Sequence, residues 1–354
     1  MRLRRRLPIW FGVLLVAAAV CIVVILRKHA PPEPARLLPG ADGFVYVNLK
    51  WVRRMNVTGQ LPAVSHDPEY QHFIQQTGFE FERDLNQAAF AIHYPENLPL
   101  ENNKRPDGPR FSEIFVGKID GQKLRAYLGG IANSIESYRS VDIYNIPLEG
   151  RMVRVAILNW DTVAASNHPD PELIRRIIDR SKKLASPFAG PQLLRQYYKD
   201  VPLASLAWAI FKVSPKGGTA TPGPVDFSFL FTNPAVLVTS ARWLGSLHLR
   251  ASAYTASAGE AHHVAEQLNT FLTMFHAAET TVPGQGSDVD VKNFFDSLKV
   301  EEHDSTAVLT AILPPGFVKK MFAEPPKEEM PAAVAPAVPK ASAPKAPRKP
   351  KKVE

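Results

Sequence analysis

An uncharged apolar run from Leu7 to Leu26 constrains this chain more than any other feature of its sequence. About twenty apolar residues in a helix rise about 30 Å, which matches the hydrocarbon thickness of a bilayer. No later segment of the sequence comes near this length. The run therefore predicts one transmembrane helix over residues 7–26, with the lipid bilayer as its partner.

The charges on either side of this run predict its orientation. Four basic residues precede it and two follow it: Arg2, Arg4, Arg5, Arg6, Arg27 and Lys28. Because Lys and Arg are retained on the cytoplasmic side, the larger cluster predicts that residues 1–6 form a cytoplasmic basic end. We therefore expect a single-pass protein of a bacterial inner membrane, whose C-terminal domain is periplasmic or extracellular.

Two other interpretations of the N-terminus remain open. A cleaved signal peptide also has a basic start and an apolar core, but this core is longer than usual and runs into Arg27 and Lys28. Lipid attachment at Cys21 is the other interpretation, although the bulky Val20 before it is unfavourable. Cys21 is also the only cysteine, so the exported part has no disulfide, which favours a bacterial envelope protein.

The net charge of +8 is concentrated at the two ends of the chain. Residues 1–28 carry six basic side chains and no acid, and residues 337–354 carry six basic and one acidic, so the body between them has a net charge of about −3. Such a body has no electrostatic footprint for nucleic acid. Nucleic acid is therefore not expected as a partner.

Residues 323–354 are rich in Pro, Ala and Lys and predict a disordered tail. This composition buries too little apolar surface to fold and favours an extended, solvated chain. Six basic residues make the tail a candidate polyanion-binding arm: Lys340, Lys345, Arg348, Lys349, Lys351 and Lys352. Its partner would be anionic lipid, a cell-wall polymer or another envelope protein, and a tail without a partner is equally compatible with the composition.

The part of the chain between anchor and tail is expected to contain a stalk and two folded units. Residues 30–38 are proline-rich and predict a stalk that holds the folded part off the bilayer. Proline and glycine residues that favour a loop then separate a first α+β unit over residues 39–186 from a second over residues 187–322. Each unit is expected to contain several strands and one long helix late in the order.

Apolar alternation predicts strands in this region, and 3.6-residue periodicity predicts helices. The expected strands cover residues 44–49, 85–94, 111–119, 141–148, 152–158, 162–165, 203–213, 225–231, 235–241, 247–255 and 306–313. The expected helices cover residues 68–77, 121–131, 171–184, 258–279 and 291–298. These elements predict an α+β fold with antiparallel or mixed sheets and a few packed helices. Their similar order in the two halves favours two similar α+β units.

No motif in the sequence marks a catalytic, cofactor-binding or metal site. His262 and His263 precede Glu266 by four and three residues on a predicted helix, a spacing that would place ligands on one face. The His-Glu-x-x-His motif is absent, so a polar helix face is the favoured interpretation. Nucleophile elbows and phosphate-binding glycine loops are also absent. We therefore predict no catalytic residues, no cofactor and no metal.

Three short motifs carry a resemblance to a known group of proteins. They are the segment Leu38–Val47, the Thr-Gly-Phe of residues 77–79 leading to Arg-Asp-Leu at 83–85, and the segment Val116–Asp120. In these motifs the chain resembles uncharacterised bacterial membrane-anchored ectodomain proteins, in which an anchor precedes α+β units that open with a Leu-Pro turn and a strand. The resemblance implies location and architecture over residues 37–315, and it implies no activity and no site residues.

These observations favour a non-catalytic binding or structural ectodomain attached to a membrane. The alternative is a periplasmic carrier or chaperone that holds a lipid or an exported polypeptide in an apolar cavity. Five phenylalanines would line that cavity: Phe227, Phe229, Phe231, Phe271 and Phe275. An enzyme with an unmarked site is the least favoured class.

Overall fold

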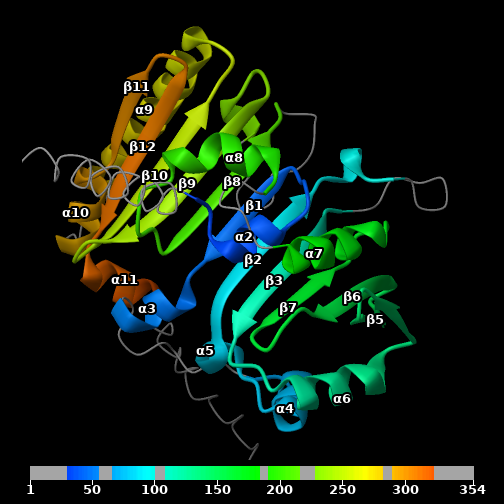
Figure 1. The fold of residues 1–354 in the computed structure, drawn as a ribbon. Helices are drawn as coiled ribbons and strands as arrows, with labels where there is room; N and C mark the ends of the chain where they lie inside the picture. Colours follow the sequence, from blue (N-terminus) through cyan, green and yellow to red (C-terminus); the bar gives the residue numbers. More distant parts are fainter. Residues whose placement is uncertain are drawn as a thin grey trace, which may run out of the picture. The chain divides into compact units, whose positions relative to one another are not determined.

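The computed structural model describes residues 30–55, 66–99, 108–183, 190–215, 228–281 and 289–322 (Figure 1). The expected membrane span lies outside these residues, as do the basic end, the tail and all of their predicted site residues. Within the described ranges, no helix is both long enough and apolar enough to cross a bilayer.

One sheet of twelve strands runs through the described part of the chain (Figure 1). Its strand order is β11-β12-β10-β9-β8-β1-β2-β3-β7-β6-β5-β4. Each neighbouring pair is antiparallel. The prediction of an α+β fold built on antiparallel strands is therefore confirmed.

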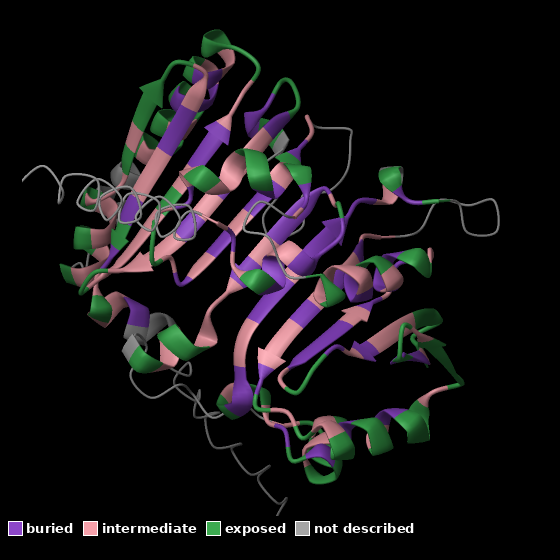
Figure 2. Ribbon diagram, viewed as in Figure 1, coloured by how far each residue is buried: buried purple, intermediate pink, exposed green. Residues whose placement is uncertain are grey.

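The strands coincide with segments rich in apolar, β-branched and aromatic residues. Their bounds are β1 (Gly43–Val47), β2 (Leu85–His93), β3 (Arg110–Gly117), β4 (Ser134–Tyr138), β5 (Val141–Leu148), β6 (Arg151–Ile157), β7 (Thr162–Ser166), β8 (Ala207–Val213), β9 (Ala235–Trp243), β10 (Leu247–Tyr254), β11 (Lys299–His303) and β12 (Thr306–Leu313). The edge strands β4 and β11 are mostly exposed, whereas the residues of the central strands β1 and β8 are mostly buried or half-buried (Figure 2).

The helices lie between these strands. Their bounds are α2 (Glu33–Leu37), α3 (Leu49–Met55), α4 (Pro68–Thr77), α5 (Phe81–Asp84), α6 (Gly121–Ile131), α7 (Glu172–Lys182), α8 (Gln192–Tyr197), α9 (Ala258–Thr281), α10 (Val289–Asp296) and α11 (Pro315–Phe322), with 3₁₀ turns η1 (Pro95–Asn97), η2 (Tyr198–Asp200) and η3 (Ser228–Leu230). The bounds of α4 and α6 agree with the prediction, because the side chains of Asp67 and Asp120 accept hydrogen bonds from the first turn of each helix.

The central strands β1 and β8 pair directly with each other. From this centre outward, both halves follow one order: three consecutive strands, a helix, and a later strand that pairs with the third. The helix and the later strand are α6 and β7 in one half and α9 and β12 in the other. The two predicted units are thus halves of one continuous sheet, and the predicted boundary between residues 186 and 187 lies outside the described ranges.

Helices cover both faces of the sheet. On one face, Phe44 and Ile210 pack in the largest core cluster with residues of α2, α7 and α8, and we call it the α7 face. Val45 and Ala209 alternate with these residues and define the opposite face, the α9 face. There α9 packs through Val264 on the second half, while α6 packs on the first half. In Figure 1, α7 and α8 lie in front of the sheet and α9 behind it.

The expected stalk over residues 30–38 is wrong for its second part. Residues Glu33–Leu37 form α2, and both Ala35 and Leu38 are completely buried in the main core. The proline-rich composition predicts an extended chain. The apolar residues Ala35, Leu37 and Leu38 instead pack against the sheet and α7. This segment is therefore part of the folded body.

Other expectations also differ from the structure. Of the strand predicted over residues 225–231, the described part contains the 3₁₀ turn η3 instead. The strand β4 was not expected, because its turn into β5 uses Arg139 and Ser140, both with positive φ (49° and 60°), instead of the usual Asn-Gly or Gly pair. The short helices α3, α8 and α11 were not expected either, since few residues in each carry a periodic pattern.

Candidate functional site

An apolar groove of about 440 Å³ lies on the α9 face of the second half of the sheet. Its floor consists of alanines on four neighbouring strands: Ala207 and Ala209 on β8, Ala241 on β9, Ala251 on β10 and Ala311 on β12. Strand register places these five side chains on one face. Because a methyl group is short, the floor lies low and leaves space above the sheet.

The C-terminal part of α10 forms a wall of this groove. Phe294 on α10 and Leu298 after it both line the space, and Phe294 stacks on Phe317 of α11 with 5.1 Å between ring centroids. On the floor, Val45 and Thr239 are only partly buried, so the groove is open to solvent. The groove is therefore a partly covered surface and not a sealed core cavity.

The floor of the groove offers little chemistry. Of the side chains that register places on this face, Thr239 is the polar one, and the others are Ala, Val and Leu. Ser240 and Arg250 alternate with them, so their side chains point to the α7 face. This arrangement binds an apolar group by burial, and the described lining brings no pair of acid, base or nucleophile to the floor.

A second apolar hollow, of about 170 Å³, lies on the same face in the first half of the sheet. It lies between the sheet residues Phe115 and Val163 and the helices α4, α5 and α6. Aromatic rings crowd its α4 and α5 side, where Phe73 stacks on Phe81 with 5.9 Å between centroids. Its smaller volume suits a single side chain or a small apolar group.

Glu113 lies on the α9 face of β3, where register pairs it with Phe90 and Ala165. Burial raises the pKa of Glu113 above its ordinary value. A neutral carboxyl group is therefore favoured there more than at an exposed position. The residue places a titratable group on the strip of sheet between the two hollows.

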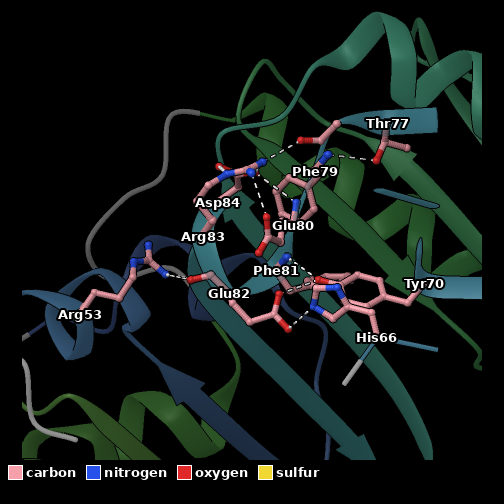
Figure 3. A network of polar contacts seen from close by, with 11 residues as sticks. Arg53, His66, Tyr70, Thr77, Phe79, Glu80, Phe81, Glu82, Arg83 and Asp84 are labelled. Atoms are coloured by element: carbon pink, nitrogen blue, oxygen red, sulfur yellow. Dashed lines mark hydrogen bonds and ion pairs between the residues drawn. The ribbon is translucent and has the colours of Figure 1, made fainter. Parts of the chain in front are cut away.

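A network of polar contacts joins α3, α4 and α5 at one end of the sheet (Figure 3). The Tyr70 hydroxyl donates to Glu82 Oε2 over 2.8 Å and accepts from the backbone N–H of Phe81 over 2.8 Å. Burial and the bond to Glu82 raise the pKa of Tyr70 to about 12. His66 Nε2 lies 3.5 Å from Glu82 Oε1, and Arg53 donates to the carbonyl of Glu82 over 3.2 Å.

Three residues of this network offer potential metal-ligand atoms within 4.8 Å of one another, namely His66, Glu80 and Glu82. Each of the two carboxylates already has a protein partner: Glu80 pairs with Arg83 over 2.8 Å, and Glu82 accepts from Tyr70. Burial raises the pKa of Glu82, but its own backbone N–H, Tyr70 and His66 lower the pKa more strongly in sum. The hydrogen bonds and ion pairs of this network therefore hold α3, α4 and α5 together.

A second polar network is buried on the α7 face. His93 Nε2 lies 3.2 Å from Ser112 Oγ, and Ser112 Oγ lies 3.0 Å from Ser166 Oγ. A serine next to a histidine is the arrangement of an activated nucleophile. Ser112 is, however, completely buried, so no substrate reaches its hydroxyl. These contacts therefore supply hydrogen-bond partners to polar side chains that are buried in the core.

Of the five phenylalanines expected to line a cavity, the three whose side chains the structure describes do not gather around one. Phe231 is buried in the core cluster beneath α9, while Phe229 and Phe271 are more than half exposed. Phe227 and the side chain of Phe275 lie outside the described residues. The groove is lined instead by alanines of β8, β9, β10 and β12. Their alternation in the sequence Ala207-Trp-Ala209 is the signal that identifies a shallow sheet face.

The histidine pair of the sequence prediction lies on the surface of α9. His262 Nδ1 lies 3.0 Å from Glu302 Oε2 of β11, and His262 Nε2 lies 3.3 Å from Glu266. Hydrogen bonding to Glu302 and the charge of Glu266 raise the pKa of His262. These contacts link α9 to the edge strand, in agreement with a polar helix face.

No protein-family model and no curated protein matches this chain. Among solved structures, it is similar to crystal form IV of TP0453, with a TM-score of 0.41 and 9% identity over 82% of this chain and 96% of that chain. Crystal form III of TP0453 gives a TM-score of 0.40 and 9% identity over 82% and 97%. At these scores the similarity carries no argument about function.

Proposed function

We propose that this chain is a single-pass membrane protein whose ectodomain binds an apolar molecule without chemical conversion. The groove floored by Ala209 and its neighbours carries this proposal. Its volume of about 440 Å³ falls within the range of about 300–1,000 Å³ typical of small-molecule sites, and its lining is mostly apolar. The occupant that fits this chemistry is the hydrocarbon chain of a lipid.

The energetics favour such an occupant. Each methylene group removed from water contributes about 0.8 kcal/mol, so a chain of several methylenes gains enough to bind a preformed groove. Small floor residues allow a chain to lie flat on the strands, whereas Phe294 and Leu298 cover one side. An exported polypeptide would need hydrogen-bond partners for its backbone, and the paired central strands offer none on this face.

The location follows from the sequence and belongs to the same proposal. Residues 7–26 anchor the chain in a bacterial inner membrane, and the excess of arginine before this span keeps the N-terminus in the cytoplasm. The ectodomain and the basic tail are then periplasmic or extracellular. The tail brings six cations to anionic lipid or to another envelope component.

The architecture adds an inference about origin. The halves that begin with β1 and β8 share one order of strands and a crossing helix, and they meet as antiparallel neighbours. Two similar α+β units joined through β1 and β8 account for this arrangement. The groove then belongs to the second unit and the smaller hollow to the first.

Photocrosslinking tests the proposed ligand. The full chain in membranes is incubated with a palmitate analogue that bears a diazirine, and crosslinked peptides are mapped by mass spectrometry. We expect crosslinks on β8, β9, β10 and α10, in addition to those on residues 7–26. Ala209→Phe fills the groove and removes the crosslinks on the strands.

Ala126→Phe is the matched control, because Ala126 is exposed on α6 outside the groove. It should keep the full crosslinking pattern. Crosslinks confined to residues 7–26 in the unmodified chain, or unchanged crosslinking in Ala209→Phe, would show that the groove does not hold a hydrocarbon chain.

A further inference from the structure

Large apolar side chains project from the connections at one end of the sheet. Trp160, between β6 and β7, is 80% exposed, Trp51 on α3 is 41% exposed, and Leu203 and Leu244 are at least half exposed. We call these four residues the tryptophan end. Exposed tryptophans are costly in a monomer, because an indole carries a large apolar area.

Strand register places these four connections at the same end. β1 ends at Val47, which pairs with Ala207 at the start of β8, and Ala207 pairs with Ala241 near the end of β9. Leu203 and Leu244 lie just beyond these strand ends. Thr162 at the start of β7 likewise pairs with Val116 near the end of β3. Both halves of the sheet thus contribute to the tryptophan end.

The turn that carries Trp160 is held by hydrogen bonds. Asp161 N donates to Asn159 Oδ1 over 3.1 Å, and Thr162 Oγ1 donates to Asp161 Oδ1 over 2.8 Å. The backbone N–H of Gly117 on β3 also donates to the carbonyl of Asp161 over 2.9 Å. The protein therefore holds the turn in place on the sheet and directs its indole outward.

The chain enters the folded body beside the same turn. Pro32, Glu33 and Trp160 line one hollow of about 530 Å³, and the burial of α2 fixes the position of Pro32. Four residue steps separate Leu26, at the end of the expected span, from Ala30, and they reach at most about 14 Å. A membrane anchor at residues 7–26 therefore holds this hollow close to the bilayer surface.

Basic side chains surround this entry point. Lys182 and Lys183 are exposed at the end of α7, whose Ser181 lines the same hollow, and Lys118 is exposed next to Gly117. Glu33 and Asp161, which also line the hollow, partly offset them. Interfacial tryptophans flanked by lysines are the residues that membranes select at the level of the lipid head groups.

We propose that the tryptophan end lies against the bilayer that holds the anchor, with Trp160 in the head-group region. This inference rests on the proposed anchor at residues 7–26. It adds an orientation: the strands stand with one end on the membrane, and the hairpin between β5 and β6 points away from it. The hairpin residue Leu148 pairs with Arg151 at the opposite strand ends.

Site-specific labelling tests this orientation in the full chain. Cys21→Ala removes the only cysteine, and single cysteines are then introduced by Trp160→Cys, Leu244→Cys and Leu148→Cys. Each variant receives an environment-sensitive NBD label and is reconstituted in nanodiscs that contain lipids with nitroxide head groups. Leu148 is the matched control, since it is 57% exposed at the other end.

We expect nitroxide lipids to quench the labels at positions 160 and 244 several times more strongly than the label at 148. Equal quenching at all three positions, or quenching at 148 alone, overturns the orientation while leaving the anchor intact. A label at 160 that is shielded but not quenched indicates a protein partner and overturns it as well. Failure of the chain to enter nanodiscs overturns both the anchor and the orientation.

Discussion

His93 is a buried residue whose ionisation is strongly altered by the fold. Burial, and then the neighbouring His168, lower its pKa to about 4 from an ordinary value of 6.5. The two rings contact edge to face, with 4.9 Å between centroids. His93 is therefore neutral in the folded protein at pH values where an unfolded chain already binds a proton.

This difference makes stability depend on pH. Between pH 6.5 and 4 the unfolded state binds more protons, so the free energy of unfolding should decrease as the pH falls, by up to about 3 kcal/mol from His93 alone. Urea unfolding of the full chain in a mild detergent at pH 7.5 and 5 measures the effect. His93→Gln should make the decrease in unfolding free energy between pH 7.5 and 5 smaller. His72→Gln, on the exposed face of α4, should leave this decrease unchanged. If His93→Gln shows the same decrease in unfolding free energy as the unmodified chain, His93 is not the source of the pH dependence.

At the scale of elements, α7 shows how a helix is held on the sheet. Ile174, Ile177 and Ile178 are at most 1% exposed and belong to the main core, whereas Arg176 is exposed. The periodic spacing of these isoleucines predicts both the helix and the face that it buries. The helix covers the first half of the sheet beside α2.

Truncating this face should be costly. Ile177→Ala should lower the free energy of unfolding by about 2–5 kcal/mol, because the cavity and the lost burial add together. Arg176→Ala on the same helix should change it by less than about 0.5 kcal/mol. The two midpoints in urea, measured by circular dichroism, provide the comparison. Similar small shifts for both variants would mean that α7 is not packed as the structure shows.

At the scale of the whole molecule, the pairing of β1 with β8 joins the two halves into one sheet. The main core cluster crosses this junction, since it contains Phe44 and Ile143 of the first half as well as Ile210 and Val238 of the second. Shared burial of this kind makes separate unfolding of either half unfavourable, because it would expose apolar residues of the other.

Native-state hydrogen exchange tests this cooperativity. Ile143→Ala, on β5, should accelerate amide exchange in β9 and β10 as well as in its own half. Leu148→Ala on the same strand is the control, because Leu148 is exposed and its loss should leave exchange unchanged. Acceleration confined to the first half would show two independent folding units.

Local signals were sufficient for many elements. The aspartates that cap α4 and α6, and the Glu149-Gly150 turn with positive φ at both residues, act within a few residues of where they stand. The same local rules predicted α2 as extended stalk, because its prolines outweigh three apolar residues whose partners come from α7 and the sheet. A pattern of a few neighbouring residues does not show whether they are buried against distant segments of the chain.

The candidate site was less accessible from the sequence. Alternating alanines such as Ala207 and Ala209 indicate a small-residue strand face, but only the register of β8 with β9, β10 and β12 brings five of them together into one floor. The described phenylalanines of the expected cavity are instead divided between the core, with Phe231, and the surface, with Phe229 and Phe271. A groove forms only where no large side chain of a neighbouring element fills the space. The sequence of a single segment does not specify this.

The sequence by itself determined the apolar span at residues 7–26 as a prediction of membrane attachment, the charge at both ends, most strands and five of the ten described helices, because these depend on composition and short-range spacing. The tertiary structure decided that the two halves share one sheet through β1 and β8, that α2 is buried, and that alanines from four strands form a groove. These features arise from contacts between residues far apart in the chain, whose free energy depends on the assembled surfaces and not on any local pattern.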